Sequence, residues 1–422
     1  MFSIFSKQKT AVPNSGQILN FDYLKPNTYY FDSACQTLRP QQVIEAENKY
    51  YHEFNSCGHR VKYKWGEQTD RLVQECRGNL LKLVNKSEKD YTVAFTLNTT
   101  FGINQVLQQI NGGFKQIITS EIEHNSVFLT SMTWAKRHGA TRIVLPRSQD
   151  GSLIYEKNQL ENSIVILNTT SNIDGRELKN AQQLAKDVHE KGGIFLIDAC
   201  QTFVHNPEVL KNIEFDAVFG SGHKMNAPSV GFIIIKKKLL RSLDCFLIGG
   251  STVSDVKLDS YELIEDESEL YARIEPGLQN YAGIIGLNAA IKWRQNWKFT
   301  PGGGFDTVLE EFNTGGKKTF NAAEYENLLS LYLNKKLAEV PQITLLNKEP
   351  SPVVSLYADE LDGHKLAMYL SEVGVMCRSG YHCCHYYLKE KLNLPPLFRI
   401  SLGLNNTPEQ IAFIIDKLKV MV

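Results

Sequence analysis

Short apolar segments recur through the first three quarters of the chain, each bounded by polar or glycine-containing sequence. Seven of them predict β-strands: YTVAFT (91–96), KQIITS (115–120), TRIVLP (141–146), SIVILN (163–168), GIFLID (193–198), DAVFGS (216–221) and VGFIII (230–235). Continuous apolar runs of this length are typical of strands that are buried on both faces of a sheet.

Amphipathic segments lie between these predicted strands. A helix is expected from about Phe101, and ELKNAQQLAKDVHEKGG (177–193) combines the helical period with a glycine stop. Strands and helices alternate in this way from about residue 75 to 295. The pattern predicts an α/β fold with a mostly parallel sheet and helices on both of its faces.

The chain has 422 residues, which is too long for one ordinary domain. Residues 301–319, PGGGFDTVLEEFNTGGKKT, interrupt the alternation and resemble an inserted surface loop. Helix and strand patterns resume after this segment. We therefore predict a large domain over residues 20–296 and a smaller α+β domain formed by residues 1–19 and 297–422.

The composition of the chain limits which classes of binding partner are expected. Hydrophobic residues make up 42% of the chain, as in globular proteins, and 46 basic residues balance 46 acidic ones. Nothing in this balance argues for nucleic acid or an anionic membrane as a partner. No secretory signal or membrane-length apolar run is visible, and eight scattered cysteines suit free thiols in a reducing cytoplasm. A cytoplasmic protein is expected.

The carboxyl ends of five predicted strands carry polar and titratable side chains. Ligands bind at this edge of a parallel sheet. The five ends read Asn98-Thr99-Thr100, Glu123-His124, Asn168 to Asn172, Asp198 to Gln201, and Ser221-Gly222-His223-Lys224. A purely structural sheet would not need this set, so the edge is the predicted site.

Three features of this set together suit pyridoxal phosphate. Thr99 and Thr100 lie at a probable helix start, where free N–H groups and hydroxyls bind phosphate. Asp198 ends a very apolar strand, where a carboxylate can pair with a protonated ring nitrogen. Lys224 has an amine that can form a Schiff base with an aldehyde. This combination predicts pyridoxal phosphate as the cofactor.

The stretch MCRSGYHCCHYYLKEKL (376–392) places two cysteines side by side between two histidines. Taken alone, it is open to four interpretations: a metal site, a disulfide, buried core, or a nucleophile. The spacing does not match the ligand pairs of structural zinc sites, and a disulfide between neighbouring cysteines is strained. The other cysteines at 35, 76, 200, 245 and 377 are expected to be small buried residues.

From YYFDSACQTLRP to FRISLGLNNTPEQIAFIIDKL, the chain resembles the class V aminotransferases of fold type I. It is most similar to the group II (SUF-type) cysteine desulfurases and the related selenocysteine lyases. The stretches that carry the resemblance are SEIEHNSV, SNIDG, IDACQTFVHNPEV, FDAVFGSGHKM, RIEPGLQNYAGIIGLNAA and RSGYHCC.

The resemblance implies a role for each matching residue. Lys224 would bind the cofactor and move protons at the substrate Cα, His124 would stack on the cofactor ring, and Cys383 would take the sulfur. The other implied cofactor contacts are Thr99, Thr100, Ser221 and His223 at the phosphate, Asp198 at the ring nitrogen and Gln201 at the ring hydroxyl. The implied substrate contacts are Asn172, Arg378 and Arg399. His382 and Arg378 are expected to lower the pKa of Cys383.

The chain departs from the family pattern at several positions. Tyr381 and Cys384 stand where histidine and alanine are usual, and Leu278 replaces a threonine that reaches the phosphate from the neighbouring subunit. Asp174 is also unusual. Cys384 is either a small filler or a second thiol that takes over the sulfur. The stretch CGHRVKYKW aligns with a family segment at the active-site entrance and carries His59-Arg60.

The resemblance therefore implies a homodimeric enzyme that converts L-cysteine to L-alanine and passes persulfide sulfur to an acceptor protein. Iron–sulfur cluster assembly and thiolation are the implied destinations. Selenocysteine lyase or another class V activity, such as C–S lyase or epimerase, is the alternative. A non-catalytic redox or metal-binding protein that uses Cys383 and Cys384 is a further alternative. Otherwise no metal is expected.

Overall fold

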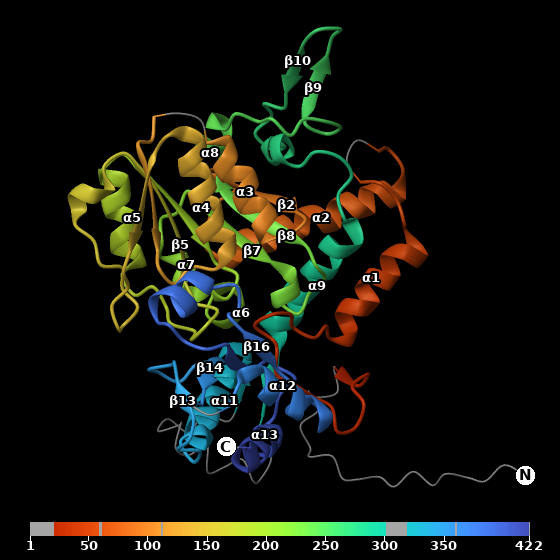
Figure 1. Ribbon diagram of the computed structural model, residues 1–422. Coiled ribbons are helices and arrows are strands. Elements are labelled where there is room, and N and C mark those ends of the chain that lie inside the picture. Colours follow the sequence, from red (N-terminus) through yellow and green to blue (C-terminus); the bar gives the residue numbers. More distant parts are fainter. Residues whose placement is uncertain (1–20, 59–60, 111–112, 301–318, 359–360, 422) are drawn as a thin grey trace, which may run out of the picture.

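The structure is a computed structural model, and it describes residues 21–58, 61–110, 113–300, 319–358 and 361–421. A seven-stranded sheet forms the centre of the larger part of the molecule (Figure 1). Its strands are β2 (Tyr91–Thr96), β3 (Gln116–Ser120), β4 (Thr141–Leu145), β5 (Ser163–Asn168), β6 (Ile194–Asp198), β7 (Ala217–Ser221) and β8 (Gly231–Lys236). All seven predicted strands are present, and their ends lie within one residue of the prediction.

The sheet has the order β2-β8-β7-β6-β5-β3-β4. The pairs from β7 to β4 are parallel, whereas β8 runs antiparallel to both β2 and β7. The connection from β7 to β8, residues 222–230, is too short for the crossover that a parallel pair requires. The prediction of a mostly parallel α/β sheet is therefore confirmed, with β8 as the exception.

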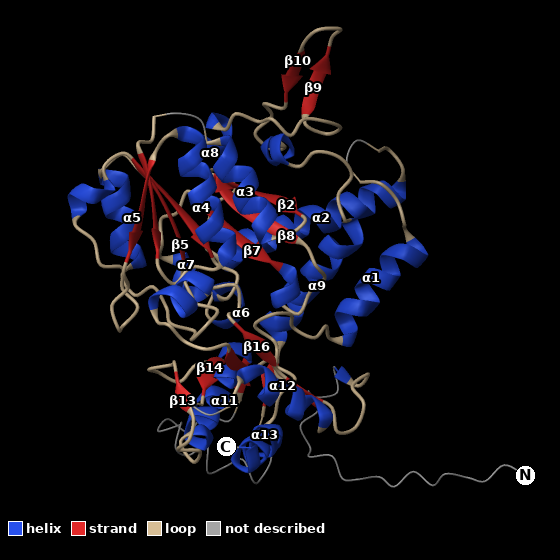
Figure 2. Cartoon of the chain, in the orientation of Figure 1, coloured by secondary structure: helices blue, strands red, loops and turns tan. Residues whose placement is uncertain are grey.

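Helices cover both faces of this sheet, as Figure 2 shows. On β5, Val165 and Leu167 belong to one apolar cluster, and Ile164 and Ile166 belong to another. The first cluster includes side chains from α2 (Lys64–Leu83), η2 (Lys157–Leu160), α5 (Ala181–Glu190), α6 (Thr202–His205), α7 (Glu208–Lys211) and α9 (Tyr281–Asn296). Helix α1 (Gln41–Glu53) packs on α9. The second includes α3 (Thr99–Gln109), α4 (Asn125–His138), α8 (Lys237–Ser242) and η4 (Leu270–Ile274). We call this assembly the large-sheet unit.

A second sheet has its own apolar core, below the first in Figure 1. It is antiparallel, with the order β13 (Thr344–Leu345), β14 (Val353–Tyr357), β17 (Leu397–Ser401) and β16 (Arg378–Gly380). Helices α11 (Ala322–Leu337), α12 (Gly363–Glu372) and α13 (Pro408–Met421) pack against it. We call this assembly the small-sheet unit.

The N-terminal end of the described chain joins the small-sheet unit. Strand β1 (Tyr29–Tyr30) pairs in parallel with β15 (Val375–Met376), and Phe31 lies in the small-sheet core. Strands β11 (Lys298–Phe299) and β12 (Phe320–Asn321) pair on either side of the predicted loop 301–319, which lies, apart from Thr319, outside the described residues. The domain boundaries remain a prediction, and residues 1–19 also lie outside the described part.

Two further elements matter for the site and its surroundings. A hairpin of β9 (Val253–Val256) and β10 (Tyr261–Leu263) projects away from the large-sheet unit (Figure 1). A π-helical turn, η5 (Tyr386–Lys391), follows the paired cysteines. None of the helices in the described ranges is both long enough and apolar enough to cross a bilayer.

Candidate active site

A pocket of about 650 Å³ lies where the carboxyl ends of β5 and β6 face the small-sheet unit. It is lined by eleven of the twelve predicted site residues: Thr99, Thr100, His124, Asn172, Asp198, Gln201, His223, Lys224, Arg378, Cys383 and Arg399. The twelfth, Ser221, touches the pocket through His223, whose Nδ1 lies 2.6 Å from the Ser221 hydroxyl. The structure thus brings together side chains that are up to 300 residues apart in the sequence.

Asp198 is fixed at the end of β6 by its own hydrogen bonds. Its buried carboxylate accepts the main-chain N–H of Cys200 on Oδ1 at 3.1 Å and the hydroxyl of Ser126 on Oδ2 at 3.2 Å. Each carboxylate oxygen can accept more than one hydrogen bond, so Oδ2 retains acceptor capacity toward the pocket. This arrangement fits a carboxylate that pairs with a protonated ring nitrogen.

The start of α3 forms a cradle for an anion. Asn98 caps the helix by accepting the N–H of Phe101 at 2.9 Å, which leaves the first-turn N–H groups of Thr99 and Thr100 free. Gly231 allows β8 to approach this turn closely, because a Cβ there would lie 2.5 Å from the main chain of Asn98. The cradle fits a phosphate group.

His223 lies on the other side of this cradle. Burial, followed by the charges of Lys224 and Arg39, lowers its pKa to about 4. The ring is therefore neutral near pH 7 and offers one N–H. Thr37, which the sequence did not single out, fixes the turn because both its N–H and its hydroxyl donate to the carbonyl of His223.

His124 is held at the entrance of α4. Its Nδ1 accepts the N–H of Ser126 at 3.1 Å, so the imidazole itself caps the helix. Burial and the charge of Lys224 lower the pKa of His124 to about 4, although Asp198 opposes this effect. The ring is therefore neutral at pH 7.

Arg399 and Arg378 provide a place for a carboxylate. Arg399 is buried and donates to the carbonyl of Asn172 at 3.0 Å and to Asp32 at 3.1 Å. Within the described part of the chain, its Nε–H has no partner. Burial lowers the pKa of Arg399, and the charge of Arg378 lowers it further. An anion between the two guanidinium groups would relieve both effects.

Cys35 is a site residue that the sequence analysis missed. We expected a small buried residue, but Cys35 is partly exposed, lines the pocket, and its Sγ accepts a hydrogen bond from Arg378. The prediction was wrong because the turn after β1 lies against the small-sheet unit, a long-range contact that no local pattern signals. Cys76, Cys200 and Cys245 are buried, as predicted.

The loop that carries Cys383, which we call the predicted catalytic loop, has an uncommon main-chain conformation. His382 and Cys383 have φ values of +45° and +58°, in the left-handed region that non-glycine residues rarely occupy. Two hydrogen bonds from the large-sheet unit hold this pair. The Asn172 side chain donates to the carbonyl of His382, and the N–H of Asn125 donates to the carbonyl of Cys383, both at 2.7 Å.

The same loop makes further contacts with the large-sheet unit through residues that follow Cys383. The ring of Tyr386 stacks on Phe128, with centroids 4.8 Å apart, and Lys391 forms an ion pair with Glu121. Asn172, predicted to hold the substrate carboxylate, uses one amide hydrogen on the loop and keeps a second. Cys383 is therefore positioned mainly by residues of the other unit.

His382 does not carry the charge that we expected near Cys383. Only 5% of the residue is exposed, and neither ring nitrogen has a hydrogen-bond partner among the residues that the structure describes. Burial, followed by the charges of Arg399 and Arg378, lowers its pKa to about 2. The ring is neutral at pH 7, so of the two predicted cations only Arg378 can stabilise a Cys383 thiolate.

Cys384 is packed as a small apolar side chain. It is 1% exposed and lies in an apolar cluster with Ile122, Ile173 and Leu388. Burial raises the pKa of its thiol, which disfavours the reactive thiolate. Of the two interpretations above, the structure favours the filler. Both loop cysteines are free thiols, and the described residues contain no cluster of three or more His, Cys, Asp or Glu that could hold a metal.

The structure also gives the surroundings of Asp174 and Leu278, two other positions at which the chain departs from the family pattern. Asp174 is buried and forms an ion pair with Arg176 at 2.7 Å. Arg176 also donates a hydrogen bond to the hydroxyl of Tyr387. Leu278 is 75% exposed in the loop before α9. His59 and Arg60 lie outside the described residues.

The profile of the aminotransferase class-V family matches residues 29–301 and 303–414. The chain belongs to this family. It is 29% identical over 408 residues to a probable cysteine desulfurase of Pyrococcus abyssi, covering 94% of this chain and 95% of that protein. It is 27% identical to a cysteine desulfurase of Escherichia coli O157:H7, covering 92% of each chain.

Solved structures share the fold of this chain. The apo cysteine desulfurase of Thermococcus onnurineus superposes with a TM-score of 0.79 at 24% identity, over 94% of both chains. The cysteine desulfurase CsdA of Escherichia coli gives a TM-score of 0.78 at 23% identity, over 95% of this chain and 96% of that one. At these identities the structures support the fold type I architecture.

The hydrogen bond from Asn172 to the loop can be tested directly. Asn172→Ala removes one of two bonds that hold the left-handed pair, so the loop should relax and expose Cys383. We expect iodoacetamide to alkylate Cys383 about five- to tenfold faster, on the basis of one lost hydrogen bond, as measured by peptide mass spectrometry. Thr170→Val is the control, because that pocket hydroxyl bonds to Thr202 and not to the loop. An unchanged rate in Asn172→Ala would contradict the positioning role.

The buried neutral state of His382 predicts a loss of stability in acid. The unfolded side chain takes up a proton below about pH 6.5, while the folded one stays neutral, so the free energy of unfolding falls as the pH drops below 6.5. At pH 5 this loss is about 2 kcal/mol. Asparagine tolerates the left-handed conformation. His382→Asn should therefore lose about 2 kcal/mol less free energy of unfolding between pH 7 and pH 5 than the wild type.

Urea denaturation followed by tryptophan fluorescence measures this difference. His52→Asn, at an exposed position of α1, is the matched control and should behave like the wild type. Equal losses in wild type and His382→Asn would show that the folded ring is protonated.

Proposed function

We propose that the protein is a pyridoxal-phosphate-dependent cysteine desulfurase that converts L-cysteine to L-alanine and carries the sulfur as a persulfide on Cys383. One observation carries this proposal. A thiol from the small-sheet unit lines the same pocket as Lys224 and Asp198. Reactions at Cα or Cβ alone, such as those of a C–S lyase or an epimerase, need no such thiol, whereas sulfur transfer requires one.

The residues of the pocket fit the cofactor. Lys224 would hold its aldehyde carbon, and Asp198 would pair with its ring nitrogen. Its phosphate would lie between the start of α3 and the pair Ser221 and His223, and Gln201 would hold its ring hydroxyl. When bound, pyridoxal phosphate supplies an electron sink that stabilises negative charge on the substrate Cα.

The chain itself supplies the remaining chemistry. Arg378 and Arg399 bind the substrate carboxylate, and the free Lys224 amine removes the Cα proton. The Cys383 thiolate attacks the substrate sulfur, so that an S–S bond forms while the C–S bond breaks and its electron pair remains with Cβ. Protonation of that carbon gives alanine, and Cys383 carries one extra sulfur atom. Cysteine and one thiol thus become alanine and one persulfide.

The persulfide then passes to an acceptor protein, for iron–sulfur cluster assembly or for thiolation. Selenocysteine is the alternative substrate, because its selenium would meet the same thiol in the same pocket. Parallel assays of alanine release from L-cysteine and L-selenocysteine distinguish the two activities.

We further propose that a second copy of this chain covers the surface beside the phosphate cradle. Four exposed apolar side chains lie on this surface, namely Leu97, Phe101, Phe246 and Leu278. The segments that carry them are joined, because Gln105 of α3 donates to the carbonyl of Ile274 and Gly277 donates to that of Gly250. Exposed apolar side chains gathered on joined segments are typical of protein–protein interfaces.

Replacing the nucleophile tests the proposed reaction. Cys383→Ala should abolish alanine formation from L-cysteine, a loss of at least about a thousandfold, while the visible absorbance of the bound cofactor persists. Cys384→Ala is the matched control, because the neighbouring thiol is buried, and it should keep most of the activity. Turnover of L-cysteine that survives Cys383→Ala would overturn the proposal.

A second replacement tests the cofactor attachment. Lys224→Ala should lose the covalent link, so borohydride reduction should leave no pyridoxyl group on the peptide that contains residue 224, as read by mass spectrometry. Lys237→Ala, at the start of α8, serves as the control and should be labelled at Lys224 like the wild type. A reduced adduct on Lys224→Ala would place the attachment elsewhere.

A further inference from the structure

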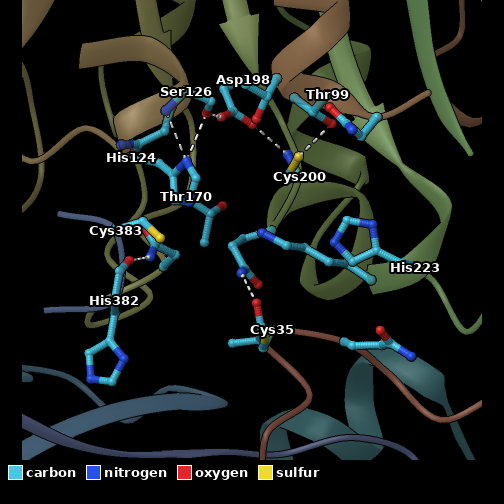
Figure 3. A pocket seen from close by; sticks show the side chains of 18 of the residues that line it. Cys35, Thr99, His124, Ser126, Thr170, Asp198, Cys200, His223, His382 and Cys383 are labelled. Atoms are coloured by element: carbon cyan, nitrogen blue, oxygen red, sulfur yellow. Dashed lines mark hydrogen bonds between the residues drawn. The ribbon is translucent and has the colours of Figure 1, made fainter. Parts of the chain in front are cut away.

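Ser126 lies between the two side chains predicted to contact the cofactor ring. Its hydroxyl oxygen is 2.8 Å from Nδ1 of His124 and 3.2 Å from Oδ2 of Asp198. Dashed lines in Figure 3 mark these contacts. Ser126 is buried and lines the pocket, and no role in the reaction has been given to it above. One hydroxyl therefore links an imidazole to a carboxylate inside the site.

The hydrogen bonds around His124 determine which ring nitrogen carries the proton. Nδ1 accepts the main-chain N–H of Ser126 at 3.1 Å. A ring nitrogen that accepts an N–H has no proton of its own, so the neutral imidazole has its proton on Nε2. Among the described residues, Nε2 has no hydrogen-bond partner, and His124 faces the pocket.

The Ser126 hydroxyl has one proton and two possible acceptors. In the structure its geometry suits donation to either Nδ1 of His124 or Oδ2 of Asp198. When a protonated ring nitrogen pairs with Asp198, that carboxylate no longer needs the hydroxyl proton. The hydroxyl can then turn to Nδ1, where it adds a second donor and stabilises the Nε2–H tautomer further.

We propose that Ser126 is a positioning residue whose hydroxyl donates to Nδ1 of His124, so that His124 presents an N–H to the substrate sulfur. An imidazole in this tautomer can donate a hydrogen bond from Nε2 to an anionic sulfur, but its Nε2 has no lone pair with which to deprotonate a thiol. In the proposed reaction, the sulfur that leaves Cβ becomes the terminal, negatively charged atom of the persulfide. His124 stabilises that charge through Nε2–H, and Ser126 holds it in the form that can do so.

The charges around His124 are consistent with this assignment. Lys224 in η3 (Gly222–Lys224), Arg378 in β16 and Arg399 in β17 all disfavour a positive ring, and Asp198 at the end of β6 favours one. Burial has the largest effect, and the ring stays neutral at pH 7. The hydroxyl of Ser126 stabilises this neutral form, so its removal should raise the pKa of His124.

The first test observes the ring without turnover. The holoenzyme is labelled with ring-¹⁵N histidine, and the His124 signals are identified by their loss in His124→Gln. In the wild type we expect protonated Nε2 and hydrogen-bonded Nδ1. Ser126→Ala should move the Nδ1 signal toward that of a free acceptor and raise the titration midpoint by about 0.5–1 pH unit. Ser126→Thr keeps the hydroxyl and should restore both values.

Thr130→Val is the matched control for this experiment. It removes a buried hydroxyl from the same helix, and that hydroxyl bonds only to the helix carbonyls of Ser126 and Val127. Unchanged signals and midpoint in Ser126→Ala would overturn the inference. So would a wild-type ring protonated at Nδ1, because that tautomer presents a lone pair to the pocket.

The second test uses activity and rests on the proposed function. The N–H acts on charge that develops during sulfur transfer, so Ser126→Ala should lower kcat for L-cysteine about five- to tenfold and change KM less than about twofold. Ser126→Thr should recover most of the loss. An equal change in kcat for Ser126→Ala and Thr130→Val would contradict the positioning role, because it would show that Ser126 affects the reaction only through the structure of its helix. If L-cysteine is not the substrate, the ring signals still decide the role of Ser126.

Discussion

Two hydrogen bonds between the units determine where the proposed nucleophile lies. The N–H of Asn125 and the side chain of Asn172 belong to the large-sheet unit, and they bind the carbonyls of Cys383 and His382 in the small-sheet unit. Without them, two consecutive left-handed residues would be expected to relax, since such conformations cost about 1–3 kcal/mol each. The position of the Cys383 thiol therefore depends on the contact between the units more than on the turn that carries it.

That contact works because the central sheet brings its strand ends to one edge. Parallel strands place Asp198 after β6 beside the loops that follow β3 and β5, and these loops carry His124 and Asn172. The antiparallel strand β8 then returns close to the start of α3, where Gly231 leaves room for the main chain of Asn98. The cofactor cradle and the contacts to the predicted catalytic loop are thus consequences of one sheet topology.

The sequence predicted well what depends on local pattern. Short apolar runs located all seven strands, and the polar residues at their ends included eight of the predicted site residues that line the pocket. The other three, Arg378, Cys383 and Arg399, were implied by the family resemblance. Contacts between distant segments were not accessible in this way. Cys35 against Arg378, the neutral state of His382 and the link from Ser126 to Asp198 all depend on packing between elements, which burial and geometry reveal but residue order does not.

Protonation states connect these observations. Three histidines of the pocket, His124, His223 and His382, are neutral at pH 7 because burial and nearby cations oppose a further positive charge. The positive charge of the site is therefore left to Lys224, Arg378 and Arg399, which suits a substrate with a carboxylate and a reaction that ends with an anionic sulfur. Neutral imidazoles in such a field act as hydrogen-bond donors to these anions. The positive charges that attract the substrate carboxylate thus also help to keep the three histidines neutral.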